Sequence, residues 1–449
     1  MFIKAKPVFL KGLSTVMNVT GVFTCSLPAC REKAVLRIAA ATRYRAFLSG
    51  RLISAGPARA AHGHARTDEL LIDLTQGGEL RIDVAGYYVR SYDGVKHPSF
   101  LTAEVLCGGS VLSATGYDFE GFINRSRVQK VMRFSLQRHF SEVYEGIDRL
   151  EPQEIEILPE DMKYIPREAP MPCMDELPVL SILSEGSMTR TRQCTRDPWF
   201  IRRIPEHTEG YSSQELEKAP SRDYCSMDFH PDEGSARPFE PVEIGPMRYA
   251  AFDFGRVRTG FLQADVEVLE AAELHIVHED YCPQPYVDSS RLFPQYINLV
   301  SYTLEPGTYH LENFDALEMR YLQFGVLRGR IIVRTAGIRQ FVYPEFERSA
   351  LNSADEKLNE IYDAAVSTFR QNALDVFMDC PCRERAGWLC DSYYTAQAEY
   401  AFTGDNRLER TFLGNFVDAG QLEGLPEGMI PMCYPADVTG SFIPQWAMW

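Results

Sequence analysis

Two long stretches of this chain alternate apolar and polar residues, and the alternation stops near Ser353. In the first, "ELRIDVAGYYV" places Leu80, Ile82 and Val84 on one face, and in the second "FLQADVEVLEAAELHIVHED" repeats the pattern. A period of two is typical of strands with one buried face. After Ser353 the apolar residues recur at helical intervals instead. The sequence therefore predicts a multidomain β + α protein, with two jelly-roll-like β-sandwiches followed by helices.

The predicted organisation has four parts. Residues 1–148 are expected to form an N-terminal β-sandwich and residues 242–346 a second one. Between them, residues 149–241 are rich in Pro, Glu, Ser and Arg and lack a clear period, which predicts an irregular linker or insertion. Residues 347–449 form the helical part. At 449 residues the chain is too long for one ordinary core, so several domains are expected.

A hairpin is predicted inside the first sandwich, with Ser49-Gly50 at its turn. The loop that follows carries Arg59, His62, His64 and Arg66. Two histidines at i and i+2 could bind a metal, but exposed loop histidines are usually solvated. We therefore predict no metal site and no cofactor.

The charge balance limits the partners of this protein. A formal net charge of -16 disfavours nucleic acid and anionic membranes, since the protein's own field opposes association. The 11 cysteines are odd in number and scattered, which favours reduced thiols and a cytoplasmic location. No segment reaches the ~18 apolar residues of a membrane span. Neutral substrates such as carbohydrates remain suitable, and the oligomeric state is not predicted.

The helical part opens with Ser353 and Glu356 at the spacing of a capping box. Apolar residues follow at helical intervals through Leu374, and Gly404 is placed to end a later helix as its C′ glycine. Between these points Pro381 disfavours helix at the residue before it, so the chain is expected to turn there.

The turn carries an unusual cluster, "DCPCRERAGWLCD", from Asp379 to Asp391. Carboxylates and a guanidinium group can bind sugar hydroxyls, an indole can stack on a sugar ring, and one carboxyl can transfer a proton. An Arg–carboxylate network that joins two helices would use the same residues. A thiol or zinc site is a weaker alternative, because Cys380, Cys382 and Cys390 lack Cys-x-x-Cys spacing and a nearby histidine, so these cysteines are expected to pack.

The cluster resembles the signature of the bacterial α-L-rhamnosidases of glycoside hydrolase family 78, which belong to the six-hairpin glycosidases. Three further segments are similar to that family: "SGRLISAGPARAAHGHARTDELLIDL", "FDFGRVRTGFLQADV" and "DEKLNEIYDAA". The resemblance implies an (α/α)6 catalytic barrel and an inverting exo-glycosidase that removes terminal α-L-rhamnose from glycosides or oligosaccharides. It also assigns roles, namely Glu384 as general acid and Asp379, Arg383, Trp388 and Asp391 as sugar-binding residues.

Inversion requires a second carboxylate roughly 6.5–9.5 Å away to activate water. In the resembling family that base is a glutamate late in the barrel, whereas residues 354–449 supply roughly half of twelve helices at ordinary helix and loop lengths. We therefore expect an incomplete, C-terminally truncated barrel without its base. The alternative function is a non-catalytic carbohydrate-binding protein or an inactive fragment.

Overall fold

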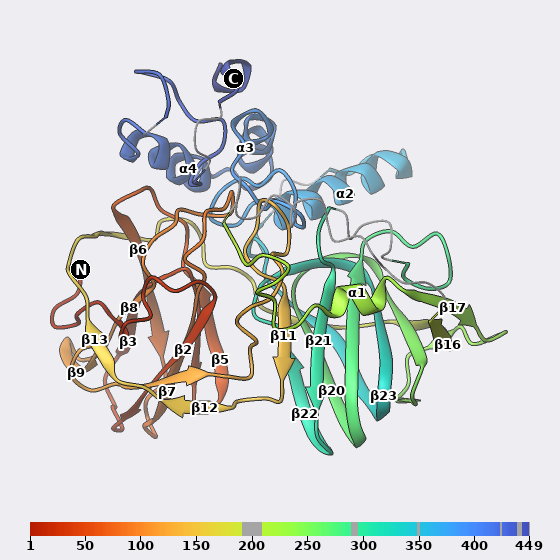
Figure 1. Cartoon of the computed structure of the whole chain (residues 1–449). Coiled ribbons are helices and arrows are strands. Elements are labelled where there is room, and N and C mark those ends of the chain that lie inside the picture. Colours follow the sequence, from red (N-terminus) through yellow and green to blue (C-terminus); the bar gives the residue numbers. More distant parts are fainter. Residues whose placement is uncertain (191–208, 289–294, 348–350, 423, 438–441, 449) are drawn as a thin grey trace.

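A computed structural model describes the whole chain except residues 191–208, 289–294, 348–350, 423, 438–441 and 449. Figure 1 shows a β-sandwich formed by the N-terminal residues, a second β-rich unit beside it, and the C-terminal helices lying across one end of both. The helical segment therefore contacts loops from the two β units.

The N-terminal sandwich consists of two sheets whose inward residues form one core, including Phe23, Leu36 and Ile82. Leu80, Ile82 and Val84 are fully buried in this core, which confirms the face predicted from the alternation. The first sheet has the order β13 (Ile155–Ile157), β1 (Val8–Leu10), β8 (Phe100–Cys107), β3 (Ala34–Ala41), β6 (His64–Ile72), β14 (Lys163–Pro166), with β9 (Ser110–Ala114) on β8. The second has the order β12 (Leu150–Pro152), β10 (Glu120–Asn124), β2 (Val19–Leu27), β7 (Gly78–Gly86), β4 (Arg43–Leu48), β5 (Arg51–Gly56).

The predicted hairpin is confirmed as β4 and β5, which pair antiparallel. Ser49 and Gly50 join them, with φ of 49° and 79°. Two successive residues with positive φ give the turn whose twist matches a two-residue hairpin.

The second β unit is built around two very long strands, β20 (Arg248–Glu279) and β23 (Leu317–Gln340). Their antiparallel pairing shifts register repeatedly, and Gly325 of β23 pairs with both Tyr249 and His275 of β20. Each shift bends the strands, so the sheet folds over its own apolar face. Eight further strands complete this sheet: β11 (Glu142–Glu145), β15 (Glu176–Pro178), β16 (Ser181–Arg190), β17 (Met227–Pro231), β18 (Arg237–Pro238), β19 (Val242–Ile244), β21 (Leu299–Leu304) and β22 (Gly307–Glu312).

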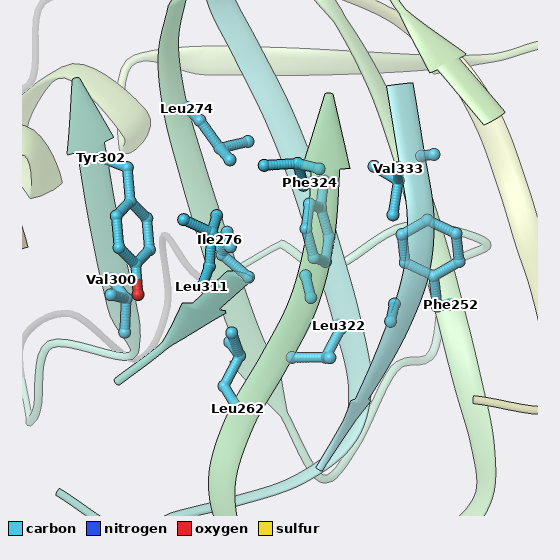
Figure 2. Packing of buried hydrophobic residues seen from close by; sticks show 14 of the residues in the cluster. Phe252, Leu262, Leu274, Ile276, Val300, Tyr302, Leu311, Leu322, Phe324 and Val333 are labelled. Carbon is cyan, nitrogen blue, oxygen red and sulfur yellow. The ribbon is translucent and has the colours of Figure 1, made fainter. Parts of the chain in front are cut away.

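Figure 2 shows side chains of this sheet meeting in one core, among them Phe252, Ile276, Leu311 and Phe324. All four are fully buried. This is the second sandwich core that the alternation predicts. The short helix α1 (Pro220–Tyr224) lies beside it and buries Tyr224 in an adjoining cluster.

The prediction of an irregular segment at residues 149–241 is corrected by the strands found there. Strands β12 to β18 all begin within this range and join the sheets of both sandwiches. Most have five residues or fewer, which is too short for a visible period. The long strand β16 does alternate, but its buried face includes Ser184 and Gly186 beside Ile182 and Met188, so it does not read as apolar. The domain limits themselves stay predictions, and residues 191–208 lie outside the described residues.

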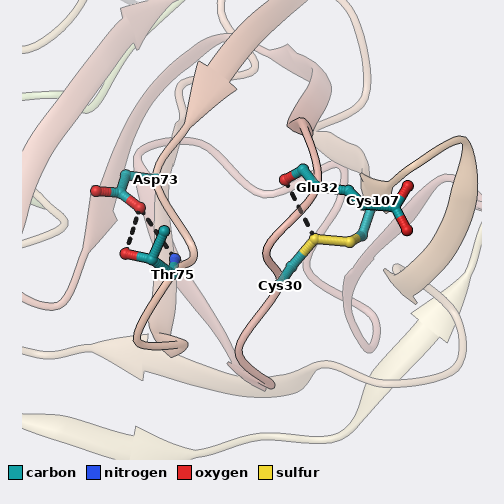
Figure 3. Close-up of a disulfide and its surroundings, with 5 residues drawn as sticks. All are labelled: Cys30, Glu32, Asp73, Thr75 and Cys107. Carbon is teal, nitrogen blue, oxygen red and sulfur yellow. Dashed lines mark hydrogen bonds between the residues drawn. A yellow bond between two sulfur atoms is a disulfide. The ribbon is translucent and has the colours of Figure 1, made fainter.

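A disulfide between Cys30 and Cys107 corrects the prediction that the thiols are reduced (Figure 3). The two cysteines are 77 residues apart in sequence, and the antiparallel pairing of β3 with β8 places Cys107 opposite Ala34, close to Cys30. The count and scatter of cysteines could not reveal a pair created by strand pairing. Because disulfides are rare in the cytosol, the cytoplasmic location loses this support and stays a prediction. Among the described residues, no helix has the length and apolar character needed to cross a membrane.

The helical segment contains α2 (Glu356–Asn372), α3 (Leu389–Thr403), α4 (Arg407–Asp418) and α5 (Pro444–Ala447). Asp355, not Ser353, caps α2 by accepting a hydrogen bond from the Lys357 amide, so the predicted capping box is wrong by two residues. Gly404 ends α3 with a φ of 68°, as predicted.

Candidate active site

The cluster from Asp379 to Asp391 forms a closed loop after α2 and continues into the first turn of α3. The Asp379 amide donates to the Ala386 carbonyl at 3.1 Å, and the Ala386 amide donates to Oδ1 of Asp379 at 3.0 Å. A Cβ on Gly387 would lie 2.5 Å from the Tyr434 carbonyl oxygen, so only glycine allows this approach. The loop thus presents side chains from a fixed backbone, and the helix predicted to stop before Pro381 ends earlier, at Asn372.

Glu384 occupies the centre of this loop and is only 5% exposed. Its Oε2 accepts a hydrogen bond from Nε1 of Trp388 at 2.6 Å, and its Oε1 accepts one from Nη2 of Arg383. One carboxyl is therefore held between an indole and a guanidinium group. Glu384 thus contacts two of the other predicted site residues directly.

Asp379 and Asp391 lie within electrostatic reach of Glu384. Burial, followed by the nearby charge of Glu384, raises the pKa of Asp379 to about 7. Burial raises the pKa of Asp391 as well, with a contribution from Glu384. The structure therefore brings all five predicted residues together.

The raised pKa of Asp379 predicts a pH dependence of stability. A carboxyl whose pKa is higher in the folded than in the unfolded state stabilises the fold at low pH, and this contribution is lost as the pH rises through about 7. Asp379→Asn keeps the acceptor for the Ala386 amide and removes the charge. We expect the apparent melting temperature of the variant to fall less than that of the wild type between pH 5 and pH 8.

The difference between the two melting curves therefore reports the loss of the Asp379 carboxyl together with its interaction with Glu384. Asp161→Asn, at an exposed position, is the matched control. Parallel curves for wild type and Asp379→Asn across this pH range would contradict the shift.

Aromatic rings surround the indole of Trp388. The ring of Tyr92, from the N-terminal sandwich, lies edge-on to it at 5.5 Å between centroids, and that of Trp446 from α5 at 4.9 Å. Both contacts come from segments distant in sequence. Spacing along the chain gave no signal for either residue.

A buried arginine from the N-terminal sandwich, Arg59, holds the backbone of the Glu384 loop and the residues before it. Arg59 forms a bidentate pair with Asp375, with Nη2–Oδ1 at 2.6 Å and Nε–Oδ2 at 2.9 Å, and a further pair with Asp93 at 3.0 Å. The same guanidinium donates to the carbonyl oxygen of Arg385, which has a left-handed φ of 52°. Burial opposes ionisation of Asp375, but the charge and hydrogen bonds of Arg59 hold its pKa well below the ordinary value.

Residues between β10 and β11 hold the other side of the loop. Nη1 of Arg138 donates to the Cys382 carbonyl at 2.8 Å, and Oγ of Ser135 donates to the Arg383 carbonyl at 2.7 Å. These two bonds fix the two backbone carbonyls that directly precede Glu384. Neither residue stood out in the sequence, because its role depends only on the tertiary structure.

The loop histidines join the two parts of the chain. Nδ1 of His62 lies 2.9 Å from the Tyr434 hydroxyl, and Nε2 lies 2.8 Å from Oδ1 of Asp437. His64 contacts the carbonyl of His62 at 3.0 Å. His62 therefore fastens the loop to the helical segment, where we had expected a solvated side chain. Within the described residues no group of three or more metal-ligating side chains is found.

The motif cysteines are free thiols, as are the other described cysteines outside disulfides. Burial raises the pKa of Cys380 to about 11 and that of Cys382 well above its ordinary value. Cys382 packs against the core of the second sandwich. Their arrangement agrees with a packing role.

The fold and this loop define a class of protein, in which two β-sandwiches precede a helical domain that presents a buried carboxyl beside a tryptophan. Residues 347–449 match the family described as the bacterial α-L-rhamnosidase six-hairpin glycosidase domain. This segment is therefore similar to that family over the residues matched. A search of curated proteins finds no match.

Solved structures share the fold of the chain. A family 78 rhamnosidase of Bacillus sp. GL1 is 16% identical with a TM-score of 0.81, over 100% of this chain and 66% of that one. An α-L-rhamnosidase of Dictyoglumus thermophilum is 15% identical with a TM-score of 0.60, over 96% and 47%. That of Streptomyces avermitilis, complexed with L-rhamnose, is 15% identical with a TM-score of 0.60, over 94% and 38%. The chain spans less than two thirds of each of these proteins.

Proposed function

We propose that this protein is an inverting exo-glycosidase that removes terminal α-L-rhamnose from glycosides or oligosaccharides. The carrying observation is the position of Glu384, buried and held between Trp388 and Arg383. The family match of residues 347–449 and the rhamnosidase fold support the substrate class. We also propose that α2 to α5 form part of an (α/α)6 barrel.

In the proposed reaction Glu384 protonates the glycosidic oxygen as the bond from that oxygen to the anomeric carbon breaks. Water attacks the opposite face of the sugar and gives its proton to a second carboxylate, which we do not assign to a residue. Asp379, Arg383, Trp388 and Asp391 hold the sugar. Hydroxyl groups of the sugar suit the carboxylates and the guanidinium, and its apolar face suits the indole.

The test is hydrolysis of 4-nitrophenyl α-L-rhamnopyranoside by the full-length protein, with the first-formed anomer followed by proton NMR. We expect release of nitrophenol and initial formation of β-L-rhamnose. The 4-nitrophenyl β-D-glucoside serves as the matched control and should not react. Initial formation of the α anomer would contradict inversion.

A carbohydrate-binding protein without activity is the competing function. It predicts heat of binding with L-rhamnose in calorimetry and no release of nitrophenol. Binding of L-rhamnose without release of nitrophenol would therefore contradict the proposed glycosidase activity.

A further inference from the structure

A cavity lies between the second sandwich and α2, with a volume of about 470 Å³. Its walls are an irregular part of β20 at Arg256–Thr259, the end of β23 with the residues after it, and one side of α2. None of its lining residues belongs to the Glu384 loop. Its size lies within the range of small-molecule sites.

Three guanidinium groups line this cavity, those of Arg256, Arg258 and Arg370, against the carboxylates of Glu345 and Asp363. Arg370 is paired with the exposed Glu345 at 2.5 Å and donates from Nε to the Tyr343 carbonyl at 3.1 Å. A local excess of positive charge is notable in a protein with a net charge of -16. Such a cavity attracts an anion.

The hydrogen-bonding capacity of these arginines is not used up within the described residues. Nε of Arg258 and Nη2 of Arg370 are both buried and have no hydrogen-bond partner there. Burial, followed by the charges of Arg256 and Arg370, lowers the pKa of Arg258. The three like charges therefore repel one another in the unliganded protein, and a bound anion would relieve that repulsion.

Neutral polar side chains complete the walls, namely Thr259, Gln340, Ser367 and Gln371. Oγ1 of Thr259 donates to Oε1 of Gln371 at 3.0 Å, so this part of the wall is already ordered. Hydroxyl and amide groups bind sugar hydroxyls, and arginine binds a carboxylate through two parallel hydrogen bonds. The cavity is too large for an inorganic anion alone.

We propose that this cavity binds a sugar acid, with the carboxylate on the arginines and the hydroxyls on the amide and hydroxyl groups opposite. The site is independent of the proposed hydrolysis at Glu384. It gives the protein a site for an acidic carbohydrate that is separate from the Glu384 site.

The experiment is calorimetric titration of the whole chain with D-galacturonate and with D-galactose, which differ only in the carboxylate at C6. We expect galacturonate to bind and galactose to bind at least about tenfold more weakly, because charge-assisted hydrogen bonds to carboxylate are the stronger kind. Arg258→Gln should weaken galacturonate binding by about tenfold. Arg256→Gln, at an exposed position of the same cavity, should weaken it in the same direction even if Arg258→Gln folds poorly.

Arg328→Gln, whose side chain is 76% exposed elsewhere on β23, is the matched control and should bind as the wild type does. Glu384→Gln should also leave galacturonate binding unchanged, which separates this site from the proposed active site. Equal affinity for galactose and galacturonate, or unchanged affinity in both Arg256→Gln and Arg258→Gln, would overturn the proposal. Inorganic phosphate binding more tightly than galacturonate would overturn the assignment to a sugar acid.

Discussion

Replacing Glu384 by glutamine is expected to lower the rate of methyl α-L-rhamnoside hydrolysis by about 10²–10⁴-fold, the usual contribution of a general acid. The loss should be much smaller for 4-nitrophenyl α-L-rhamnoside, because nitrophenolate leaves without protonation. The comparison of these two substrates separates loss of a proton donor from general damage to the site. Rates for both substrates are measured with the purified wild type and variant.

Glu384 accepts one hydrogen bond from Arg383 and one from Trp388. Glutamine has only one acceptor oxygen, so its NH2 group would face the other donor. We therefore expect a modest loss of stability, which circular dichroism would measure. Glu427→Gln, at an exposed position, is the control for removal of a negative charge. If both substrates slow by the same factor, Glu384 is not the acid, and Asp379 becomes the next candidate.

Replacing Arg59 by methionine is expected to destabilise the protein by about 3–5 kcal/mol, the cost of breaking a buried ion pair by removing one partner. Arg59 is 5% exposed at its side chain and contacts two buried carboxylates, Asp93 and Asp375. Methionine fills similar space but leaves both carboxylates without that partner. Urea unfolding monitored by tryptophan fluorescence would measure the change, and Trp388 places one reporter beside the affected loop.

Arg51→Met is the matched control, because Arg51 lies exposed on β5, eight positions earlier in the same hairpin and loop. Its effect should stay within about 0.5 kcal/mol, as is usual for surface positions. A second variant, Arg59→Met with Asp375→Asn, should recover part of the lost stability, since it removes one of the two stranded charges. A loss below 1 kcal/mol for Arg59→Met alone would show that the pair with Asp375 does not support the loop.

Local sequence patterns predicted much of the fold, because strand faces, turns and helix ends depend on residues close together in the sequence. Alternation placed Leu80 and Ile276 in their cores, since side chains on a strand point to opposite faces in turn. Positive φ at Ser49-Gly50 and at Gly404 follows from turn and helix-end geometry within a few residues. Where strands were short or had Ser and Gly on the buried face, as in β16, the pattern carried too little apolar signal.

The sequence by itself determined which residues could do the proposed chemistry, because Asp379, Arg383, Glu384, Trp388 and Asp391 lie within thirteen positions and resemble one family signature. Only the tertiary structure decided what holds them. Arg59 is 316 positions from Asp375, and Arg138 is 244 positions from Cys382. Such contacts form when the sandwiches pack against the helical segment and water is removed around the charges. Because the partners are distant in sequence, their spacing along the chain does not predict the contact.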